Sequence, residues 1–129
     1  PFEIAQENFA GHHFVAAVRR KAVQAGQTLY VSGQIALHPE TGELLKGSIE
    51  EETDLVMKNL GAVLKAAGAD FSQVVKSSIF VADMGQFGRI NEVYARYFDA
   101  ESAPARETVE VANLPRYVNV EISVIAVLD

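Results

Sequence analysis

The stretch APARETVEVANLPRYVNVEIS, residues 103–123, decides the fold of this chain. It contains two strand-like runs rich in β-branched residues, with Pro115 between them. Arg106 stands at the start of the first run, and Glu121 stands inside the second among valines and isoleucines. Charged residues are rarely buried without a partner. This pair therefore predicts either a structural ion pair or a functional site.

The second run continues to residue 127 and alternates between two faces, as a strand does. One face is apolar and consists of Val118, Val120, Ile122, Val124 and Ala126. The opposite face is mixed and consists of Tyr117, Asn119, Glu121, Ser123, Ile125 and Val127. A mixed face is typical either of a subunit interface that carries a polar site or of an ordinary, half-solvated sheet face.

Upstream of this stretch, two segments predict three more strands, with a turn between the segments. Residues 16–37 read as two strands hinged at 24–27, because β-branched and aromatic residues fill the second part. HPETGEL, residues 38–44, predicts a turn, since proline and glycine suit its backbone angles. FSQVVKSSIFVAD, residues 71–83, predicts the third strand.

Two segments carry helical periodicity. An S-x-x-E capping box at 48–51 starts a helix that Gly68 ends. Asp83 with Gln86 offers a second helix start. The second helix carries an apolar stripe that predicts core rather than a ligand-binding surface: Phe87, Ile90, Val93, Tyr94, Tyr97 and Phe98. Gly88 costs helix stability relative to alanine, which hints at close packing there.

The order of these elements is β-β-α-β-α-β-β. It predicts an α+β sandwich in which a single sheet carries two helices on one face. A chain of 129 residues is long enough to bury its own core, so we expect one domain over residues 1–129. This arrangement leaves the other face of the sheet bare.

The composition excludes several classes of protein. There is no cysteine, so disulfides, thiolate metal sites and a cysteine nucleophile are absent. The formal net charge of −6 disfavours nucleic-acid binding, and the one tight basic cluster, residues 19–21, is either solvated surface or a polyanion site. His12, His13 and His38 lack the spacing of a metal site. With neither a membrane-length apolar run nor a signal-peptide pattern, we expect a cytoplasmic protein.

Arg106 and Glu121 suit one kind of chemistry. An arginine fork binds a carboxylate through two parallel charge-assisted hydrogen bonds. A partly desolvated glutamate takes or gives a proton when its environment raises its pKa toward the working pH. Together they favour attack of water on a small substrate that bears a carboxylate. The alternative is a structural salt bridge between neighbouring strands.

Several segments form a pattern known from one family. The most specific residues are Pro104, Ala105, Arg106, Val109, Ala112, Leu114, Val120, Glu121 and Ile122. Residues 29–44, 59–84 and 90–98 match in the same order. Over about residues 25–127 the chain thus resembles the Rid proteins, which are reactive-intermediate (enamine/imine) deaminases of the YjgF-like group, also described as L-PSP endoribonuclease-like.

The resemblance implies a chorismate-mutase-like fold and a homotrimer in which three sheets form a central barrel, with sites in clefts between subunits. It implies cofactor-free hydrolysis of small 2-imino or 2-enamino acids, such as 2-iminopropanoate, to 2-oxo acids and ammonia. Arg106 would hold the substrate carboxylate, and Glu121 would activate water and shuttle protons. The residues that would line the substrate cleft are Ser32, Gly33, Asn91 and Thr108.

Two departures from the family pattern bear on the substrate. Family members often carry a G-P-Y motif before the first strand, whose tyrosine lines the pocket; here Phe14, Arg19 or Arg20 falls at that position, depending on the register. After the key arginine, the family usually has a small residue and often a cysteine next, where this chain has Glu107 and Thr108. We expect strand alternation to point Glu107 away from the arginine.

Three other functions stay open at this point. The family has also been described as endoribonucleases and translation inhibitors, an alternative that the acidic charge disfavours. A noncatalytic metabolite-binding trimer would keep the assembly and lose the chemistry. A deaminase of a larger enamine, such as 2-aminomuconate, would use the altered pocket wall.

Overall fold

The computed structural model describes residues 4–6 and 21–129, and its elements follow the predicted order with one addition. The strands and α-helices are β1 (Ile4–Gln6), β2 (Ala22–Ala25), β3 (Thr28–Gln34), α1 (Ile49–Ala66), β4 (Val74–Val81), α2 (Phe87–Ala95), β5 (Ala105–Glu110) and β6 (Val120–Val127). The addition is β1, which pairs in parallel with β2. Neither of these helices has the length and apolar character that a membrane span needs, as far as the described residues go.

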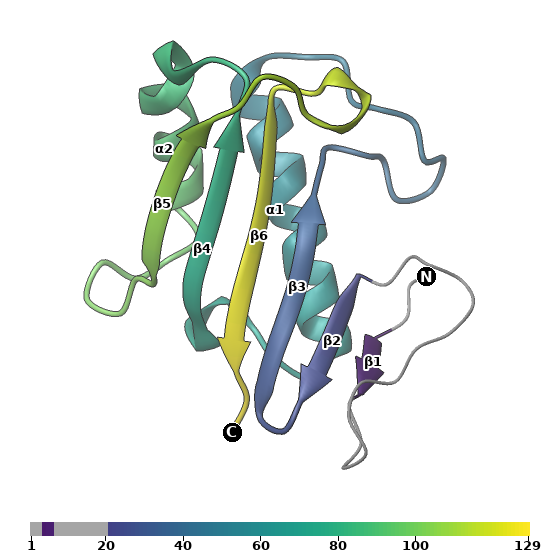
Figure 1. The fold of residues 1–129 in the computed structure, drawn as a ribbon, viewed down its shortest axis with the longest axis vertical. Helices are drawn as coiled ribbons and strands as arrows, with labels where there is room; N and C mark the ends of the chain where they lie inside the picture. The colour runs from purple at the N-terminus through teal and green to yellow at the C-terminus, as the bar shows by residue number, and fades with distance from the viewer. Residues whose placement is uncertain (1–3, 7–20) are drawn as a thin grey trace.

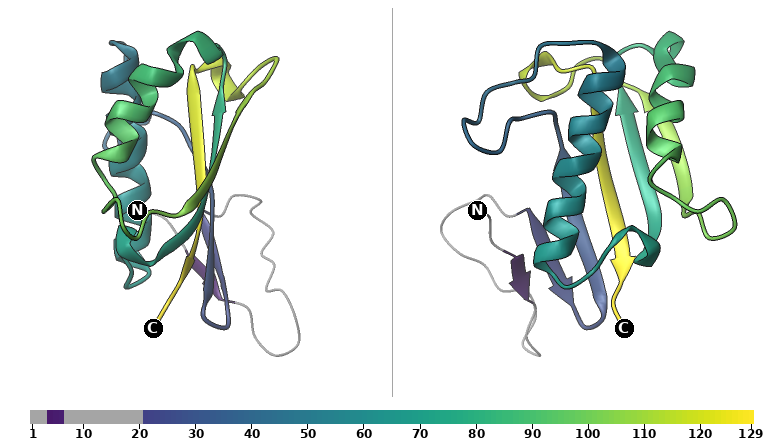
Figure 2. Two further views of the ribbon diagram at one scale, coloured as in Figure 1. Left: turned by 90° about the vertical axis from the view of Figure 1, so that its left-hand side faces the viewer. Right: turned by 180° about the vertical axis from the view of Figure 1, so that it is seen from behind.

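The strands form one sheet in the order β1-β2-β3-β6-β4-β5. Strand β6 is antiparallel to both of its neighbours, β3 and β4, whereas β4 and β5 are parallel. The last strand in the sequence therefore lies in the middle of the sheet (Figure 1). Both helices cover one face, and no helix of the described residues lies on the opposite, open face (Figure 2). This confirms the predicted α+β fold.

Helix α1 forms where the capping box predicts it. Ser48 Oγ accepts a hydrogen bond from the Glu51 N–H at 3.1 Å, and Glu51 Oε1 accepts one from the Ser48 N–H at 2.8 Å. After the helix, Gly68 has a φ of +80°, a left-handed conformation that glycine adopts without strain. The helices and the covered face of the sheet enclose a core that includes Leu29, Leu60, Ile79, Ile90 and Ile122.

The apolar stripe of the second helix is core, as predicted. Ile90, Val93 and Tyr94 are buried within α2. Tyr97 and Phe98 lie beyond the helix end, where both rings pack against Phe71 at centroid distances of 5.2 and 5.4 Å.

Two element bounds and the packing at one glycine differ from the sequence-based expectation. Asp70 caps a 3-10 turn over Phe71–Gln73, so the third predicted strand begins later than residue 71. Strand β2 continues through Ala25, which shortens the predicted hinge to residues 26–27. A Cβ atom added to Gly88 would meet nothing within 4 Å, so the expectation of close packing at this glycine was wrong.

Strand β6 shows the predicted alternation. Val120, Ile122, Val124 and Ala126 are at most 2% exposed and belong to the core, whereas Glu121, Ser123 and Ile125 are only partly buried on the open face. Asn119 was predicted to share that open face, but its side chain turns toward α1 instead. The reason is a hydrogen-bonding partner on the helix.

That partner is Glu52 of α1, whose side chain is buried. Glu52 Oε2 accepts a hydrogen bond from the Asn119 backbone N–H at 2.9 Å, and Oε1 accepts one from Asn119 Nδ2 at 2.8 Å. The Asn119 carbonyl in turn accepts a hydrogen bond from the Ala82 N–H at 3.0 Å. These contacts fix the chain just before β6, two residues ahead of Glu121.

Replacing Glu52 by alanine should lower the free energy of unfolding by about 3 kcal/mol or more, because two hydrogen bonds to a charged acceptor are lost. Denaturant unfolding at one fixed protein concentration measures this change. Glu92→Ala is the control, since Glu92 makes only an exposed ion pair with Arg96 at 3.5 Å and should change stability by no more than about 0.5 kcal/mol. If Glu52→Ala lowered the free energy of unfolding as little as Glu92→Ala, the Glu52 contacts would contribute nothing to stability.

Candidate active site

Arg106 projects from the edge strand β5 toward α2. It pairs in the sheet with Ser77 of β4, which is fully buried on the helix-covered face. Arg106 Nη1 donates a hydrogen bond to Asn91 Oδ1 at 2.6 Å. The guanidinium carbon lies 5.2 Å from the centroid of the Phe87 ring and 5.4 Å from that of the Tyr94 ring. Three α2 residues on one helix face therefore contact one guanidinium.

The rest of this guanidinium is available to a ligand. Asn91 is the only acceptor of a hydrogen bond from Arg106 within the described part of the chain, and no carboxylate there forms an ion pair with it. Arg106 is also exposed. Its Nε and Nη2 donors can thus bind a carboxylate in the two-pronged arrangement that arginine favours.

Glu121 projects from β6 onto the open face. Its side chain lies over Gly33, because a Cβ atom added to that glycine would lie 2.6 Å from Glu121 Cδ and 2.7 Å from Oε2. The pairing of β3 with β6 shifts between Val31 and Gln34, so the glycine sits at an irregularity in the sheet. Burial raises the pKa of Glu121, which is the direction that a general base working near neutral pH requires.

Arg106 and Glu121 lie on opposite faces of the sheet. Strand β4 separates β5 from β6, and Arg106 pairs with Ser77 of β4 whereas Glu121 pairs with Phe80. Three residues along a strand and two strands across place their Cα atoms roughly 14 Å apart. The alternative of a salt bridge between neighbouring strands was therefore wrong, and a single chain holds two separate groups.

We name these groups by their charged residue. The arginine half-site consists of Phe87, Asn91, Tyr94, Arg106 and Thr108. The glutamate half-site consists of Ser32, Gly33 and Glu121. Thr108 belongs to the first group because it pairs with the buried Ile79 and faces the same side of the sheet as Arg106. All six predicted site residues are thus divided between the two half-sites.

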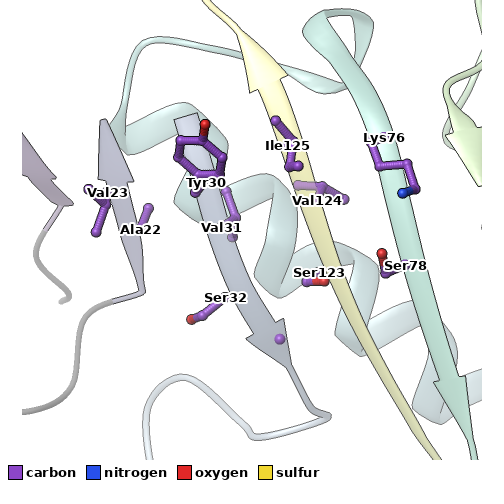
Figure 3. Close-up of a pocket in the computed structure, with 11 residues that line it drawn as sticks. Ala22, Val23, Tyr30, Val31, Ser32, Lys76, Ser78, Ser123, Val124 and Ile125 are labelled. Carbon is purple, nitrogen blue, oxygen red and sulfur yellow. The ribbon is translucent and has the colours of Figure 1, made fainter. Parts of the chain in front are cut away.

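A hollow of ≈ 430 Å³ lies on the open face across β2, β3, β6 and β4 (Figure 3). Its polar lining includes Ser32, Ser78, Ser123 and Lys76. Ser32 and Gly33 connect it to the glutamate half-site, whereas Arg106 lies on the other face and does not line it. This hollow and the Arg106 guanidinium are therefore on different sides of one chain.

Glu107, the unexpected carboxylate after the key arginine, faces the open side, as strand alternation predicts. Its Oε2 accepts a hydrogen bond from Ser78 Oγ at 3.0 Å and forms an ion pair with Lys76 Nζ at 3.3 Å. The Ser78 hydrogen bond and then the Lys76 contacts lower the pKa of Glu107. Its negative charge is thus balanced locally and does not oppose an anion at Arg106.

Two residues of the arginine half-site were predicted only as core. Phe87 is half-buried and Tyr94 is buried, yet both rings contact Arg106. Burial raises the pKa of Tyr94, although the Ser77 hydroxyl and the Arg106 charge act in the opposite direction. The signal in the sequence is their spacing from Asn91. Phe87 lies four residues before Asn91 and Tyr94 three residues after it, so all three side chains share one helix face.

Some predicted residues cannot be placed. Phe14, Arg19 and Arg20, the candidates for the family's tyrosine position, lie outside the described residues, as do His12 and His13. In residues 4–6 and 21–129, no three histidine or carboxylate side chains gather to hold a metal ion.

Comparison with known proteins identifies the family. The family model described as Endoribonuclease L-PSP matches residues 10–128. A mouse protein named 2-iminobutanoate/2-iminopropanoate deaminase is 50% identical over 107 residues, which cover 83% of this chain and 78% of the mouse protein.

Solved structures give the same result. A protein of unknown function of the conserved Rid protein family from Yersinia pestis has a TM-score of 0.84 and 40% identity, covering 88% of this chain and 90% of that one. TdcF of E. coli, solved with bound serine, has a TM-score of 0.80 and 35% identity, covering 89% of this chain and 91% of that one. With nearly its whole length matched, this chain belongs to the Endoribonuclease L-PSP family, the group that includes the Rid proteins.

Proposed function

We propose that this chain hydrolyses small 2-imino and 2-enamino acids to 2-oxo acids and ammonia without a cofactor. The observation that carries the proposal is the Arg106 guanidinium, held by Asn91 and two aromatic rings and left without a carboxylate partner among the described residues. Such a guanidinium suits the carboxylate of a 2-imino acid. The name of the mouse relative and the serine bound to TdcF support the same class of ligand.

In the proposed reaction, Arg106 holds the carboxylate and thereby orients the adjacent C=N bond. Glu121 accepts a proton from water while the water oxygen bonds to the imine carbon, and then returns the proton to nitrogen. The second water proton also reaches nitrogen as the C–N bond breaks, so ammonia leaves and the water oxygen becomes the 2-oxo group. Oxidation states balance, and no cofactor is required because the imine carbon is already electrophilic.

We further propose that the complete site forms between copies of the chain in a homotrimer. The two half-sites face opposite sides of one sheet, so a substrate bridging Arg106 and Glu121 needs each from a different copy. The open face exposes Tyr30 (49%), Val109 (43%) and Val127 (42%), apolar side chains that a neighbouring sheet would cover. The remaining half-site residues, Ser32, Gly33, Asn91 and Thr108, keep their proposed substrate contacts. The single domain over 1–129 and the cytoplasmic location stay predictions.

The proposal is tested by adding the purified protein to imines formed during the assay. A pyridoxal-phosphate dehydratase acting on L-threonine supplies 2-iminobutanoate, and an amino-acid oxidase supplies imines of other side chains. The chain should accelerate release of the 2-oxo acid and ammonia well above the spontaneous rate, with small imines preferred over a 2-aminomuconate-type enamine. Rates equal to buffer for every compound would contradict the deaminase proposal, and binding without turnover would favour the metabolite-binding alternative.

Gly33→Ala should lower kcat for 2-iminobutanoate by tenfold to a hundredfold, because a misplaced catalytic group is costly. The added methyl group would overlap the Glu121 carboxylate, which lies 2.6–2.8 Å away. The overlap is with the end of a flexible side chain, so the unfolding free energy should change by less than about 1 kcal/mol. Gly88→Ala is the matched control, since nothing lies within 4 Å of its added Cβ; an equal loss of kcat there would refute the explanation.

RNA cleavage is the second candidate, favoured by the family's description as endoribonuclease. The net charge of −6 disfavours a phosphate backbone. Cleavage of RNA by the purified chain, lost on substituting Arg106 and steeply dependent on salt, would restore this candidate.

A further inference from the structure

We propose that Tyr94 is a positioning residue whose ring presets the Arg106 guanidinium for a carboxylate. The inference rests on the proposed function, because that function assigns Arg106 to the carboxylate of the substrate. Tyr94 itself is buried and is not expected to touch the substrate. Its effect would reach the substrate through the arginine.

The Tyr94 ring is a rigid support. It is 6% exposed, and it packs against Phe98 with centroids 4.9 Å apart. The Phe98 ring in turn meets Phe71 edge-on at 5.4 Å. Arg106, by contrast, is an exposed residue on an edge strand with a long and flexible side chain. Its guanidinium carbon lies 5.4 Å from the Tyr94 centroid, within the range of a cation–π contact.

The ring, and not the hydroxyl, makes this contact. Tyr94 Oη and Ser77 Oγ are neighbours, but within the described part of the chain neither forms a hydrogen bond of good geometry. A phenol oxygen could accept a hydrogen bond from a guanidinium, but among the described residues the hydrogen bond that Arg106 donates goes to Asn91 Oδ1 and not to Tyr94. Tyr94→Phe therefore keeps the support intact, while Tyr94→Leu removes it.

Support of this kind raises affinity without a direct contact. A free arginine side chain loses much rotational freedom when it binds a carboxylate, and a side chain that is already ordered loses less. Phe87 and Asn91 act from the same helix, at 5.2 Å from the guanidinium carbon and 2.6 Å from Nη1 respectively. Helix α2 therefore presents a preset arginine, and Tyr94 is the buried part of that arrangement.

The test is calorimetric titration with 2-oxobutanoate, the product of 2-iminobutanoate hydrolysis, together with steady-state kinetics. Tyr94→Leu should weaken 2-oxobutanoate binding roughly tenfold and raise KM by a similar factor, with kcat changed by less than about threefold. Tyr94→Phe should bind within about twofold of wild type. Ile90→Ala is the control, because Ile90 is also a buried α2 residue but has no aromatic ring to offer the guanidinium, which lies over Phe87 and Tyr94.

The results separate the two proposals. Three results would each overturn the positioning role of Tyr94. Tyr94→Leu could bind 2-oxobutanoate like the wild type, Ile90→Ala could weaken binding as much as Tyr94→Leu does, or Tyr94→Phe could weaken it as much as Tyr94→Leu does. A wild-type chain that does not bind 2-oxobutanoate would also overturn that role. Should Tyr94→Leu fail to fold, Phe87→Leu tests the second, less buried ring, and unchanged binding there overturns the preset arginine. Binding as expected without any imine turnover contradicts the proposed function alone.

Discussion

Replacing Arg106 by alanine should reduce kcat/KM for 2-iminobutanoate by about a hundredfold to ten-thousandfold. The substitution removes two charge-assisted hydrogen bonds to the substrate carboxylate, each worth roughly 1.5–3 kcal/mol. Because these bonds also orient the imine carbon, both KM and kcat should suffer. The coupled release of 2-oxobutanoate and ammonia measures the loss.

Two further variants show whether the geometry or only the charge of Arg106 matters. Arg106→Lys keeps a point charge but cannot form a fork, so it should recover only part of the activity. Arg89→Ala removes another α2 arginine, whose Nε and Nη2 contact Glu50 at 2.8 and 2.7 Å, and should leave kcat/KM unchanged. Wild-type activity in Arg106→Ala would remove this arginine from the site.

Replacing Glu121 by glutamine should lower kcat by about a hundredfold or more, since general acid–base catalysis typically contributes 10²–10⁴-fold. The amide keeps the shape of the side chain and its place over Gly33 but cannot accept the proton of water. In the wild type, burial raises the pKa of Glu121. As the pH is lowered, activity should therefore begin to fall at a higher pH than it would with a glutamate of ordinary pKa. A pH profile of kcat/KM that is unchanged in Glu121→Gln would contradict this role.

Glu121→Gln should lower activity without lowering stability at neutral pH. The folded protein holds the Glu121 proton to higher pH than the unfolded chain does, because burial raises the folded pKa. The resulting stabilisation is present below the unfolded pKa and is lost as the pH rises through the folded one. At neutral pH, Glu121→Gln should thus unfold at the same temperature as the wild type or at a higher one.

Mixing the two inactive variants tests where the site is built. If Arg106 and Glu121 of one site come from different copies, trimers reassembled from equal amounts of Arg106→Ala and Glu121→Gln should regain roughly a quarter of wild-type activity, because each site draws independently on two copies. Refolding from denaturant in one vessel mixes the copies, and separately refolded samples are the control. An inactive mixture that contains mixed trimers would place both residues in the same copy.

Much of the fold follows from local pattern. The capping box at 48–51 begins α1, and the apolar face of β6 is the buried one, because helix capping and strand alternation depend only on nearby residues. The motif around Arg106 also identified the family and the two charged residues. The motif alone does not show that Arg106 and Glu121 lie two strands apart and on opposite faces of the sheet.

Tertiary structure decided that separation. Strand order depends on pairings between distant segments, and β4 lies between β5 and β6, which puts Arg106 and Glu121 two strands apart. They face opposite sides because Arg106 pairs with Ser77 and Glu121 with Phe80, three residues further along β4. The same long-range packing turned Asn119 toward Glu52, 67 residues away, and brought the Tyr94 ring to the guanidinium. Local alternation alone thus places Glu121 on the mixed face of its strand, whereas the packing of distant elements decides that Arg106 faces α2, how far it lies from Glu121 and which side chains support it.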